Sequence, residues 1–109
     1  MNPPAPRRGE LWLGRLDKVR PIVVLTRDPL GAVLTGVIAA PVTSTIRGLS
    51  TEVPLSTEDG ARKVCVANLD NVQLVLRTQL VRRVGRLRSS TMNSMCTALA
   101  IAVGCDAPN

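Results

Sequence analysis

The sequence predicts a mainly β fold, a small and strongly curved antiparallel barrel or sheet of about five to seven short strands closed by a C-terminal helix. Short apolar segments separated by turn residues fill the chain as far as residue 87, and after residue 89 the apolar spacing becomes helical. A chain of 109 residues, 45% of them hydrophobic, is long enough for one domain with one core. We therefore expect a single domain over residues 7–104, between flexible tails at 1–6 and 105–109.

The strand predictions follow from residue type along the chain. Residues 10–16 alternate, with Leu11 and Leu13 on one face. Pro21 then opens the apolar run 22–25, IVVL, which is typical of a central strand buried on both faces. The other predicted strands span residues 33–42, 52–55, 63–67 and 80–87, with a short strand or turn within 68–76 and a polar loop at 45–50.

The last segment has the spacing of an amphipathic helix. Its apolar residues recur at i, i+3, i+4, i+7, i+8 and i+11 and are expected to pack on the core. They are Met92, Met95, Cys96, Leu99, Ala100 and Val103. Ser89 or Ser90 is expected to cap the start of this helix, and Gly104 to end it.

The composition excludes several kinds of chemistry. The chain has no His and no Tyr, so Ser-His-Asp and Cys-His catalysis is excluded. Trp12 is the one aromatic residue, which argues against modules that stack successive bases on aromatic side chains, and we expect it to pack rather than to bind. Basic residues number 14 against 8 acidic ones, and most are Arg, which binds phosphate through a planar fork. A polyanionic partner is the expectation that follows.

The cysteines and apolar runs bear on location and cofactors. The three cysteines, at 65, 96 and 105, lack the spacing of a metal site, so we expect neither a metal nor another cofactor. We expect Cys65 and Cys96 in the core and Cys105 as a free thiol. Since the cysteine number is odd and we find no segment of membrane-spanning length, we expect a cytoplasmic protein.

Two short stretches carry the candidate site. In VRPIVVLTRD, Arg20 stands directly before the proline that opens the central strand. In PVTSTIRG, the hydroxyl residues Thr43, Ser44 and Thr45 end the next long strand. A cation and hydroxyl donors side by side are what phosphate chemistry requires. Taken singly, each is equally typical of an ordinary surface arginine or of a strand end.

The second half of the chain adds a basic segment. Its arginines are predicted to follow the phosphates of a nucleic acid, although charge on an exposed edge strand also protects against aggregation. They are Arg77, Arg82, Arg83, Arg86 and Arg88. Regular alternation would place Arg82 and Arg86 on one face and Arg83 on the other.

Four segments together resemble the MazF/PemK family of toxin endoribonucleases: RRGELWLGRL, VRPIVVLTRD, IAAPVTSTIRG and NLDNVQLV. The resemblance runs from about residue 7 to residue 103. It implies an SH3-like β-barrel, usually a homodimer, that cleaves single-stranded RNA at selected sequences without a metal and so inhibits translation and growth. It also implies a cognate antitoxin whose disordered acidic tail covers the RNA groove.

The resemblance also implies roles for single residues. Carried over by motif, the catalytic pair is Arg20 and Thr43, with Ser44 as the neighbour that replaces Thr43 if the register differs by one residue. As RNA-binding residues we expect Arg15, Lys18, Thr45, Arg47, Arg82, Arg83 and Arg86. The first loop, residues 15–19, is shorter than in many members of the family, so the loop at 45–50 and the arginines would carry more of the specificity.

Without His or a metal, cleavage requires attack by the 2′-OH of the RNA itself, which leaves a 2′,3′-cyclic phosphate and a 5′-OH. Arginine and hydroxyl donors would stabilise the charged phosphorane. The general base stays open among Glu10, Asp17 and Asp70. Two other functions compete: a CcdB-like gyrase poison, disfavoured because the C-terminal segment holds no tryptophan, and a non-catalytic RNA-binding module, which would show the same residues.

Overall fold

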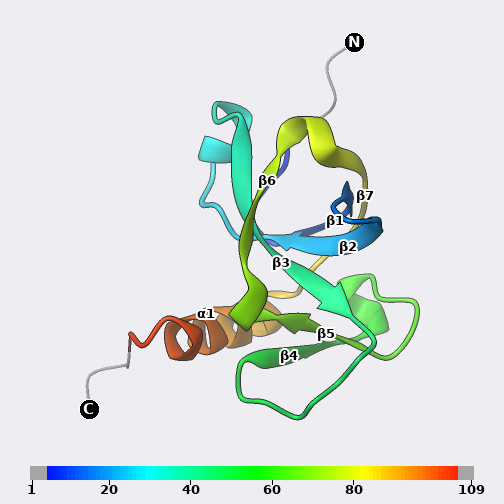
Figure 1. Ribbon diagram of the computed structural model, residues 1–109, viewed down its shortest axis with the longest axis vertical. Helices are drawn as coiled ribbons and strands as arrows, with labels where there is room; N and C mark the ends of the chain where they lie inside the picture. Colours follow the sequence, from blue (N-terminus) through cyan, green and yellow to red (C-terminus); the bar gives the residue numbers. More distant parts are fainter. Residues whose placement is uncertain (1–4, 106–109) are drawn as a thin grey trace.

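The computed structural model describes residues 5–105 and contains seven strands and one α-helix there (Figure 1). The elements are β1 (Glu10–Arg15), β2 (Val19–Val24), β3 (Gly36–Thr43), β4 (Glu52–Leu55), β5 (Cys65–Asn68), β6 (Gln73–Leu76), β7 (Leu80–Arg86) and α1 (Ser89–Ala102). Four short 3₁₀ turns connect them: η1 (Leu30–Ala32), η2 (Thr57–Asp59), η3 (Leu69–Asn71) and η4 (Arg77–Gln79). The predicted sequence of strands followed by one terminal helix is confirmed. Residues 1–4 and 106–109 of the predicted tails lie outside the described residues, whereas Pro6 is buried.

All described strand pairs are antiparallel, in the order β4-β5-β3-β2-β1-β7, and β6 also pairs with β3. Strand β3 belongs to both parts of the sheet. Its first half pairs with β6 between Gly36 and Ala39, and its end pairs with β5 at Val42 and Thr43. In Figure 1, β3 runs from the β1–β2–β7 layer down to the β4–β5 layer, which lies beside α1. Closure of this curved sheet into a barrel stays a prediction.

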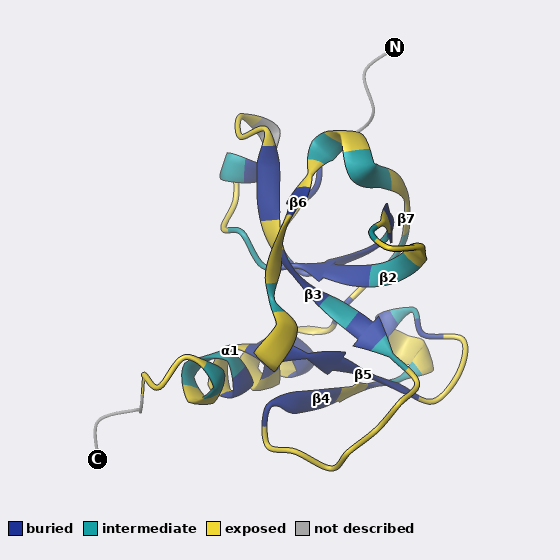
Figure 2. Cartoon of the chain, viewed as in Figure 1, coloured by how far each residue is buried: buried dark blue, intermediate teal, exposed yellow. Residues whose placement is uncertain are grey.

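Two apolar clusters lie on opposite faces of β1 and β2. The buried part of β2 is dark blue in Figure 2. One packs Leu11 and Val23 against β4, β5 and α1. The other gathers Trp12, Ile22 and Val24 with residues of β3 and β6. Because successive side chains of a strand point to opposite faces, a strand between two clusters is apolar at every position. This confirms a central strand over residues 22–24, whereas Leu25 lies just beyond the end of β2, and it makes Trp12 a core residue, 2% exposed.

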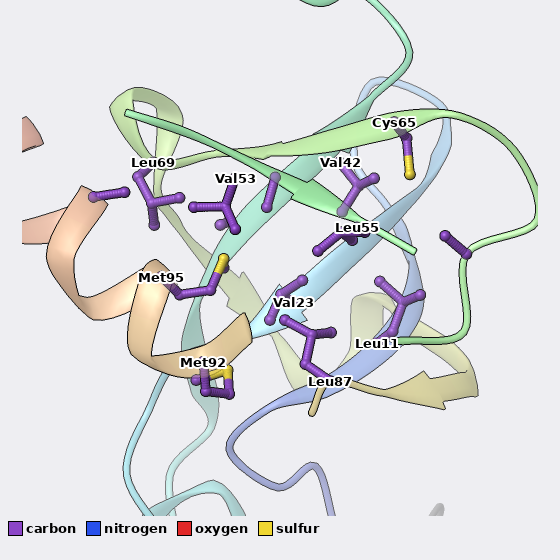
Figure 3. Packing of buried hydrophobic residues seen from close by; sticks show 14 residues of the cluster. Leu11, Val23, Val42, Val53, Leu55, Cys65, Leu69, Leu87, Met92 and Met95 are labelled. Carbon is purple, nitrogen blue, oxygen red and sulfur yellow. The ribbon is translucent and has the colours of Figure 1, made fainter. Parts of the chain in front are cut away.

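Helix α1 covers the larger cluster (Figure 3), and the row of its side chains that is buried there is narrower than predicted. Met92 and Met95 point into the core as predicted, and Ala98, which the predicted period did not include, is buried as well. Cys96 and Val103, both predicted to be buried, are exposed, because they lie one position off the line along which the helix touches the sheet. Cys65 is buried as predicted.

The C-terminal end of α1 matches its prediction, and the N-terminal end does not. Gly104 adopts a left-handed conformation with φ +75°, its N–H donates to the carbonyl of Ile101, and the next N–H donates to the carbonyl of Ala100. These two hydrogen bonds form the Schellman motif, which favours glycine at this position. At the other end the cap residue is Arg88, and no side chain caps the helix; Ser89, a predicted cap, is already its first residue.

Several strand boundaries also differ from prediction. Strand β2 begins at Val19, two residues before the proline expected to open it, and β5 begins at Cys65 instead of residue 63. Strand β3 begins at Gly36 instead of residue 33, because the chain after the 3₁₀ turn η1 is still turning at Val33 and Leu34. Strand β5 extends to Asn68 and is followed by the turn η3, so the segment 68–76 contributes a turn and the short strand β6.

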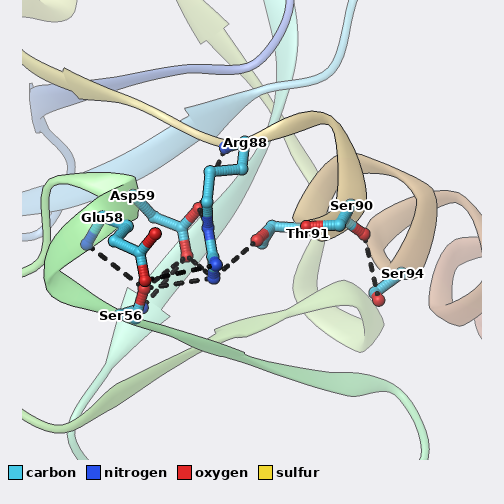
Figure 4. A network of polar contacts seen from close by, with 7 residues as sticks. All are labelled: Ser56, Glu58, Asp59, Arg88, Ser90, Thr91 and Ser94. Carbon is cyan, nitrogen blue, oxygen red and sulfur yellow. Dashed lines mark hydrogen bonds and ion pairs between the residues drawn. The ribbon is translucent and has the colours of Figure 1, made fainter.

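A buried carboxylate joins the start of α1 to the turn after β4 (Figure 4). Asp59 is fully buried and accepts hydrogen bonds from the backbone N–H groups of Ser56 and Arg88, at 3.0 and 2.9 Å. The guanidinium of Arg88 lies against the same carboxylate, with Nε 3.3 Å away, and also pairs with the exposed Glu58. Burial alone raises the pKa of Asp59, but the bonds from Arg88 and Ser56 outweigh it and hold the pKa well below its ordinary value of 3.8.

This turn also lies directly against β7. Gly60 follows Asp59 with φ +98°, a conformation that favours glycine, and a Cβ on Gly60 would lie 2.9 Å from the Cα of Gly85. The two glycines therefore let the backbones of the turn and of β7 touch. Asp59 and the glycine pair together fix the position from which the next segment, residues 61–64, leaves the turn.

We expect Asp59→Asn to lower the free energy of unfolding by about 2 kcal/mol. The amide cannot accept on both sides, so buried N–H donors lose their partner; the attraction to Arg88 adds little because that side chain is 43% exposed. Urea unfolding measures the change. The matched control is Glu58→Gln, which removes the exposed partner of the same arginine and should change stability by less than about 0.5 kcal/mol.

The difference between wild type and Asp59→Asn should shrink in acid. Since the folded-state pKa of Asp59 is depressed, its contribution is complete above the unfolded-state pKa, near 3.8, and is lost as the pH falls from there through the folded-state value. Urea titrations between about pH 6 and about pH 3 test this linkage. A difference that stays constant over this range would contradict it.

Candidate active site

Three strand ends meet at one edge of the sheet. The pairing of Ile22 with Pro41 places the start of β2 beside the end of β3, and the pairing of Thr43 with Val66 places the start of β5 on the other side. Because both neighbours run antiparallel to β3, the first residues of β2 and the residues before β5 flank the residues that end β3. The sequence-predicted Arg20 and Thr43 are thereby brought to the same edge.

A cleft of about 740 Å³ opens at this edge. Its lining comes from the start of β2, the end of β3, the loop before β5, and parts of β1 and β7. The lining residues are Leu11, Leu13, Lys18, Val19, Arg20, Pro21, Val42, Thr43, Ser44, Thr45, Gly60, Ala61, Arg62, Lys63, Cys65, Arg82 and Val84. It therefore combines apolar side chains with hydroxyls and five cations, and no described acidic side chain lines it.

Arg20 is held by a carboxylate from the short loop before it. Its Nε and Nη2 donate to the two carboxylate oxygens of Asp17, at 2.9 and 3.1 Å. This bond lowers the pKa of Asp17 to about 2 and raises that of Arg20. Only one edge of the guanidinium is used, so Nη1 and the second hydrogen of Nη2 stay available for another oxyanion.

The hydroxyl residues differ in how firmly they are placed. The Oγ1 of Thr43 accepts a hydrogen bond from the N–H of Thr45 at 3.0 Å, which orients the half-buried side chain and leaves its O–H free to donate. Ser44 and Thr45 line the same cleft but are exposed. The arrangement thus offers one oriented hydroxyl, that of Thr43, between Arg20 on β2 and the loop before β5.

Two of the cleft's cations were missed by sequence reasoning. Arg62 and Lys63 lie in the loop between η2 and β5, and both are exposed. The ion pairs described for Arg20, Arg83 and Arg88 include neither of these two cations. No sequence pattern indicated them, because their place beside the end of β3 follows from the pairing of β3 with β5, which the sequence does not show.

The arginines of β7 lie on two faces, but they are divided differently from the prediction of regular alternation. The register shifts so that Arg82 pairs with Leu13, Arg83 with Trp12 and Arg86 with Glu10. Paired residues share a face, so the irregularity around Val84 puts Arg86 on the side of Arg83 instead of Arg82. Of the three, only Arg82 lines the cleft.

Arg83 instead pairs with a buried carboxylate. Glu10, 3% exposed, accepts from Arg83 at 3.0 Å, from the indole of Trp12 at 3.0 Å and from the N–H of Arg7 at 2.7 Å. Burial alone raises the pKa of Glu10, but these bonds outweigh it and lower the pKa. Glu10 therefore anchors the core and does not face the cleft.

The other predicted site residues lie elsewhere. Arg15 is exposed at the end of β1, and Arg47 lies in the loop after β3, where its N–H donates to Glu52. Neither lines the cleft, and their RNA-binding role, like that of Arg86, stays a prediction. Asp70, a candidate base, accepts from the hydroxyl of Thr51 at 2.6 Å, and it is not among the lining residues. Asp17 is the candidate base that contacts Arg20.

Cys65 lies at the apolar floor of the cleft, 7% exposed, and burial raises the pKa of its thiol. A protonated, buried thiol is a poor nucleophile. Among the described residues no three His, Cys, Asp or Glu side chains gather closely enough to hold a metal ion. No helix in the described part of the chain has the length and apolar character needed to cross a bilayer.

Comparison with known proteins agrees with this arrangement. Residues 7–103 match the model of the PemK-like, MazF-like toxins of type II toxin–antitoxin systems. The chain is 43% identical over 103 residues to the probable endoribonuclease MazF5 of Mycobacterium tuberculosis, covering 92% of this chain and 94% of that protein. It is 37% identical to the endoribonuclease MazF3 of the same organism, covering 88% and 93%.

Solved structures give the same result. The M. tuberculosis toxin MazF-mt6 superposes with a TM-score of 0.86 at 36% identity, over 90% of this chain and 99% of that one. An endoribonuclease in complex with its cognate antitoxin, from a mycobacterial species, superposes with a TM-score of 0.87 at 28% identity, over 95% and 100%.

Proposed function

Because this chain belongs to the PemK-like, MazF-like toxins of type II toxin–antitoxin systems, we propose that it is an endoribonuclease whose basic cleft cleaves single-stranded RNA. One observation carries the assignment to this cleft. Arg20 and the oriented hydroxyl of Thr43 stand on adjacent strand ends, within a cleft lined by five cations and no described carboxylate. Such a cleft attracts a polyanion and offers donors where a phosphate would lie.

The proposed reaction uses the RNA's own 2′-OH as nucleophile. The 2′-oxygen forms a bond to phosphorus, the bond from phosphorus to the 5′-oxygen breaks, the 2′-OH gives up its proton and the leaving 5′-oxygen takes one. The products carry a 2′,3′-cyclic phosphate and a 5′-OH. Arg20 and Thr43 donate hydrogen bonds to the phosphoryl oxygens, whose negative charge grows in the transition state. Ser44, exposed and without an orienting bond, is the weaker candidate for the hydroxyl donor.

Neither Arg20 nor Asp17 is suited to remove the proton at neutral pH. The pKa of Arg20 is raised above an already high value, and Asp17, with a pKa of about 2, is a weak base. We propose instead that Asp17 positions Arg20. By binding Nε and Nη2 it fixes the plane of the guanidinium and leaves the Nη1–Nη2 edge for the phosphate.

The partners follow from the same charges. One similar structure is an endoribonuclease in complex with its cognate antitoxin, and we propose that this chain also has a cognate antitoxin, with an acidic disordered tail that enters the cleft. A homodimer remains an expectation from family likeness.

The first test uses purified protein, mixed-sequence single-stranded RNA and excess EDTA. We expect discrete cuts with 2′,3′-cyclic phosphate and 5′-OH ends. Arg20→Ala should lower the cleavage rate at least about a hundredfold, because a donor to the transition-state charge is lost. The matched control is Arg27→Ala, an exposed arginine outside the cleft lining, which should cleave at the wild-type rate.

The product ends and the control separate the competing functions. RNA that is bound but never cut by wild type would favour the non-catalytic RNA-binding module. RNA that is neither bound nor cut would direct attention to the gyrase-poison alternative, which a gyrase-binding assay tests. Near wild-type cleavage by Arg20→Ala would remove Arg20 from the mechanism.

The second test concerns Asp17. We expect Asp17→Asn to lower kcat about tenfold through misorientation of Arg20, while the Kd for RNA stays equal or falls because a negative charge beside the cleft is gone. The pH–rate profile above about pH 4 should keep its shape, since a group with a pKa of about 2 does not titrate there. Asp28→Asn, an exposed carboxylate outside the cleft lining, is the control. Loss of the slope of the acidic limb in Asp17→Asn would instead identify Asp17 as the base.

A further inference from the structure

The loop before β5 presents two cations to the cleft from the side opposite Arg20. Thr43 lies between the start of β2, which carries Arg20, and the start of β5, which follows Arg62 and Lys63. The cations thus stand on both sides of the oriented hydroxyl. A strand of RNA whose scissile phosphate lies at Thr43 and Arg20 must pass along this second side as well.

The charge of this loop is not neutralised nearby. The two acidic residues just before it, Glu58 and Asp59, are both paired with Arg88 (Figure 4). Among the described ion pairs none includes Arg62 or Lys63. Lys63 is close enough to Cys65 for its charge to act on that thiol, lowering the pKa that burial raises. The pair is therefore a local excess of positive charge at the wall of the cleft.

The loop is also held in place before any ligand binds. The N–H of Ala61 donates to the carbonyl of Ser56 at 3.1 Å, Asp59 is buried, and Gly60 lies against Gly85. The backbone is therefore fixed directly before Arg62, and it joins β5 at Cys65, so that binding costs less ordering entropy than binding to a free loop.

We propose that Arg62 and Lys63 form a second phosphate-binding pair, which holds the RNA phosphates adjacent to the scissile one across Thr43 from Arg20. The inference rests on the proposed function and assigns to this pair substrate binding, not chemistry. The pair acts on backbone phosphates, so it contributes equally to RNAs of different sequence.

Salt dependence of binding provides the test. Each phosphate neutralised on a single strand contributes about 0.7 to the slope of log affinity against log salt. Arg62→Ala/Lys63→Ala should therefore reduce that slope by about 1.4, which means that the wild-type advantage in affinity shrinks about sevenfold between about 50 and about 200 mM salt. Fluorescence anisotropy on an RNA with a 2′-deoxy sugar at the mapped cleavage site measures binding without cleavage.

Two further variants control for charge and folding. Arg7→Ala/Arg27→Ala removes the same charge from exposed arginines outside the cleft lining and should keep the wild-type slope. Arg62→Lys/Lys63→Arg keeps the charge of the pair and should keep the slope as well. In cleavage assays the alanine pair should raise KM and change kcat less than about threefold.

The outcomes separate this inference from the proposed function. An unchanged salt slope in Arg62→Ala/Lys63→Ala, with wild type cleaving normally, would overturn the inference alone. A fall in kcat at constant KM would also overturn it, since the pair would then act in chemistry. A wild-type protein that cuts no RNA would refute the proposed function, and the slopes on the same uncut RNA would still decide whether the pair binds phosphate.

Discussion

The buried carboxylate of Asp59 is the constraint on which the geometry of the cleft depends. It binds backbone N–H groups from two segments, the turn after β4 and the start of α1, which are far apart in the sequence. One side of the cleft follows that turn directly, and the helix that begins at the other segment covers the main core. A carboxylate without these donors would be costly to bury, so its full burial means that the turn and the helix start are fixed together.

Strand β3 likewise joins separate parts of the structure, because it pairs in both parts of the sheet. Because its end is flanked by antiparallel strands on both sides, the hydroxyls that end it lie between two strand starts. Strand ends need no loop folding to bring them together; the pairing registers do so. The cleft therefore has a rigid centre at Thr43, where the candidate chemistry lies, and loops contribute charge around it.

The sequence carried enough information for the strand content, for the central strand and for the position of Arg20 and of the hydroxyls from Thr43 at strand ends. These depend on local patterns: a proline before a run of Ile, Val and Leu residues, and hydroxyls after one. It could not show the features that depend on register. The irregularity at Val84, which moves Arg86 to the face of Arg83, inserts one residue into an otherwise regular alternation and leaves no compositional mark.

The sequence also could not show which arginines form ion pairs with acids far away in the chain. Arg88 was grouped with the basic surface, yet a buried acid 29 residues earlier in the chain takes it. Arg83 is likewise taken by Glu10, 73 residues before it. Arg62 and Lys63 were missed because their place at the cleft follows from the pairing of β5 with β3; the acids before them in the chain, Glu58 and Asp59, pair with Arg88. Long-range pairing thus decides which arginines remain for an anion.

This pairing of some arginines with acids bears on how one cleft could bind both a substrate and an inhibitor. The acids of the turn are turned away toward Arg88, and Asp17 uses one edge of Arg20 only, so the lining presents positive charge without an internal competitor at most positions. An acidic peptide, as proposed for the antitoxin tail, and an RNA backbone would both satisfy such a lining, and they would exclude one another because they would require the same donors. What differs between them is the chemistry at Thr43: a phosphodiester offers phosphorus and a 2′-OH beside that hydroxyl, and a carboxylate does not. The basic lining alone thus accounts for capture of either anion, and the centre of the cleft determines that only RNA would react.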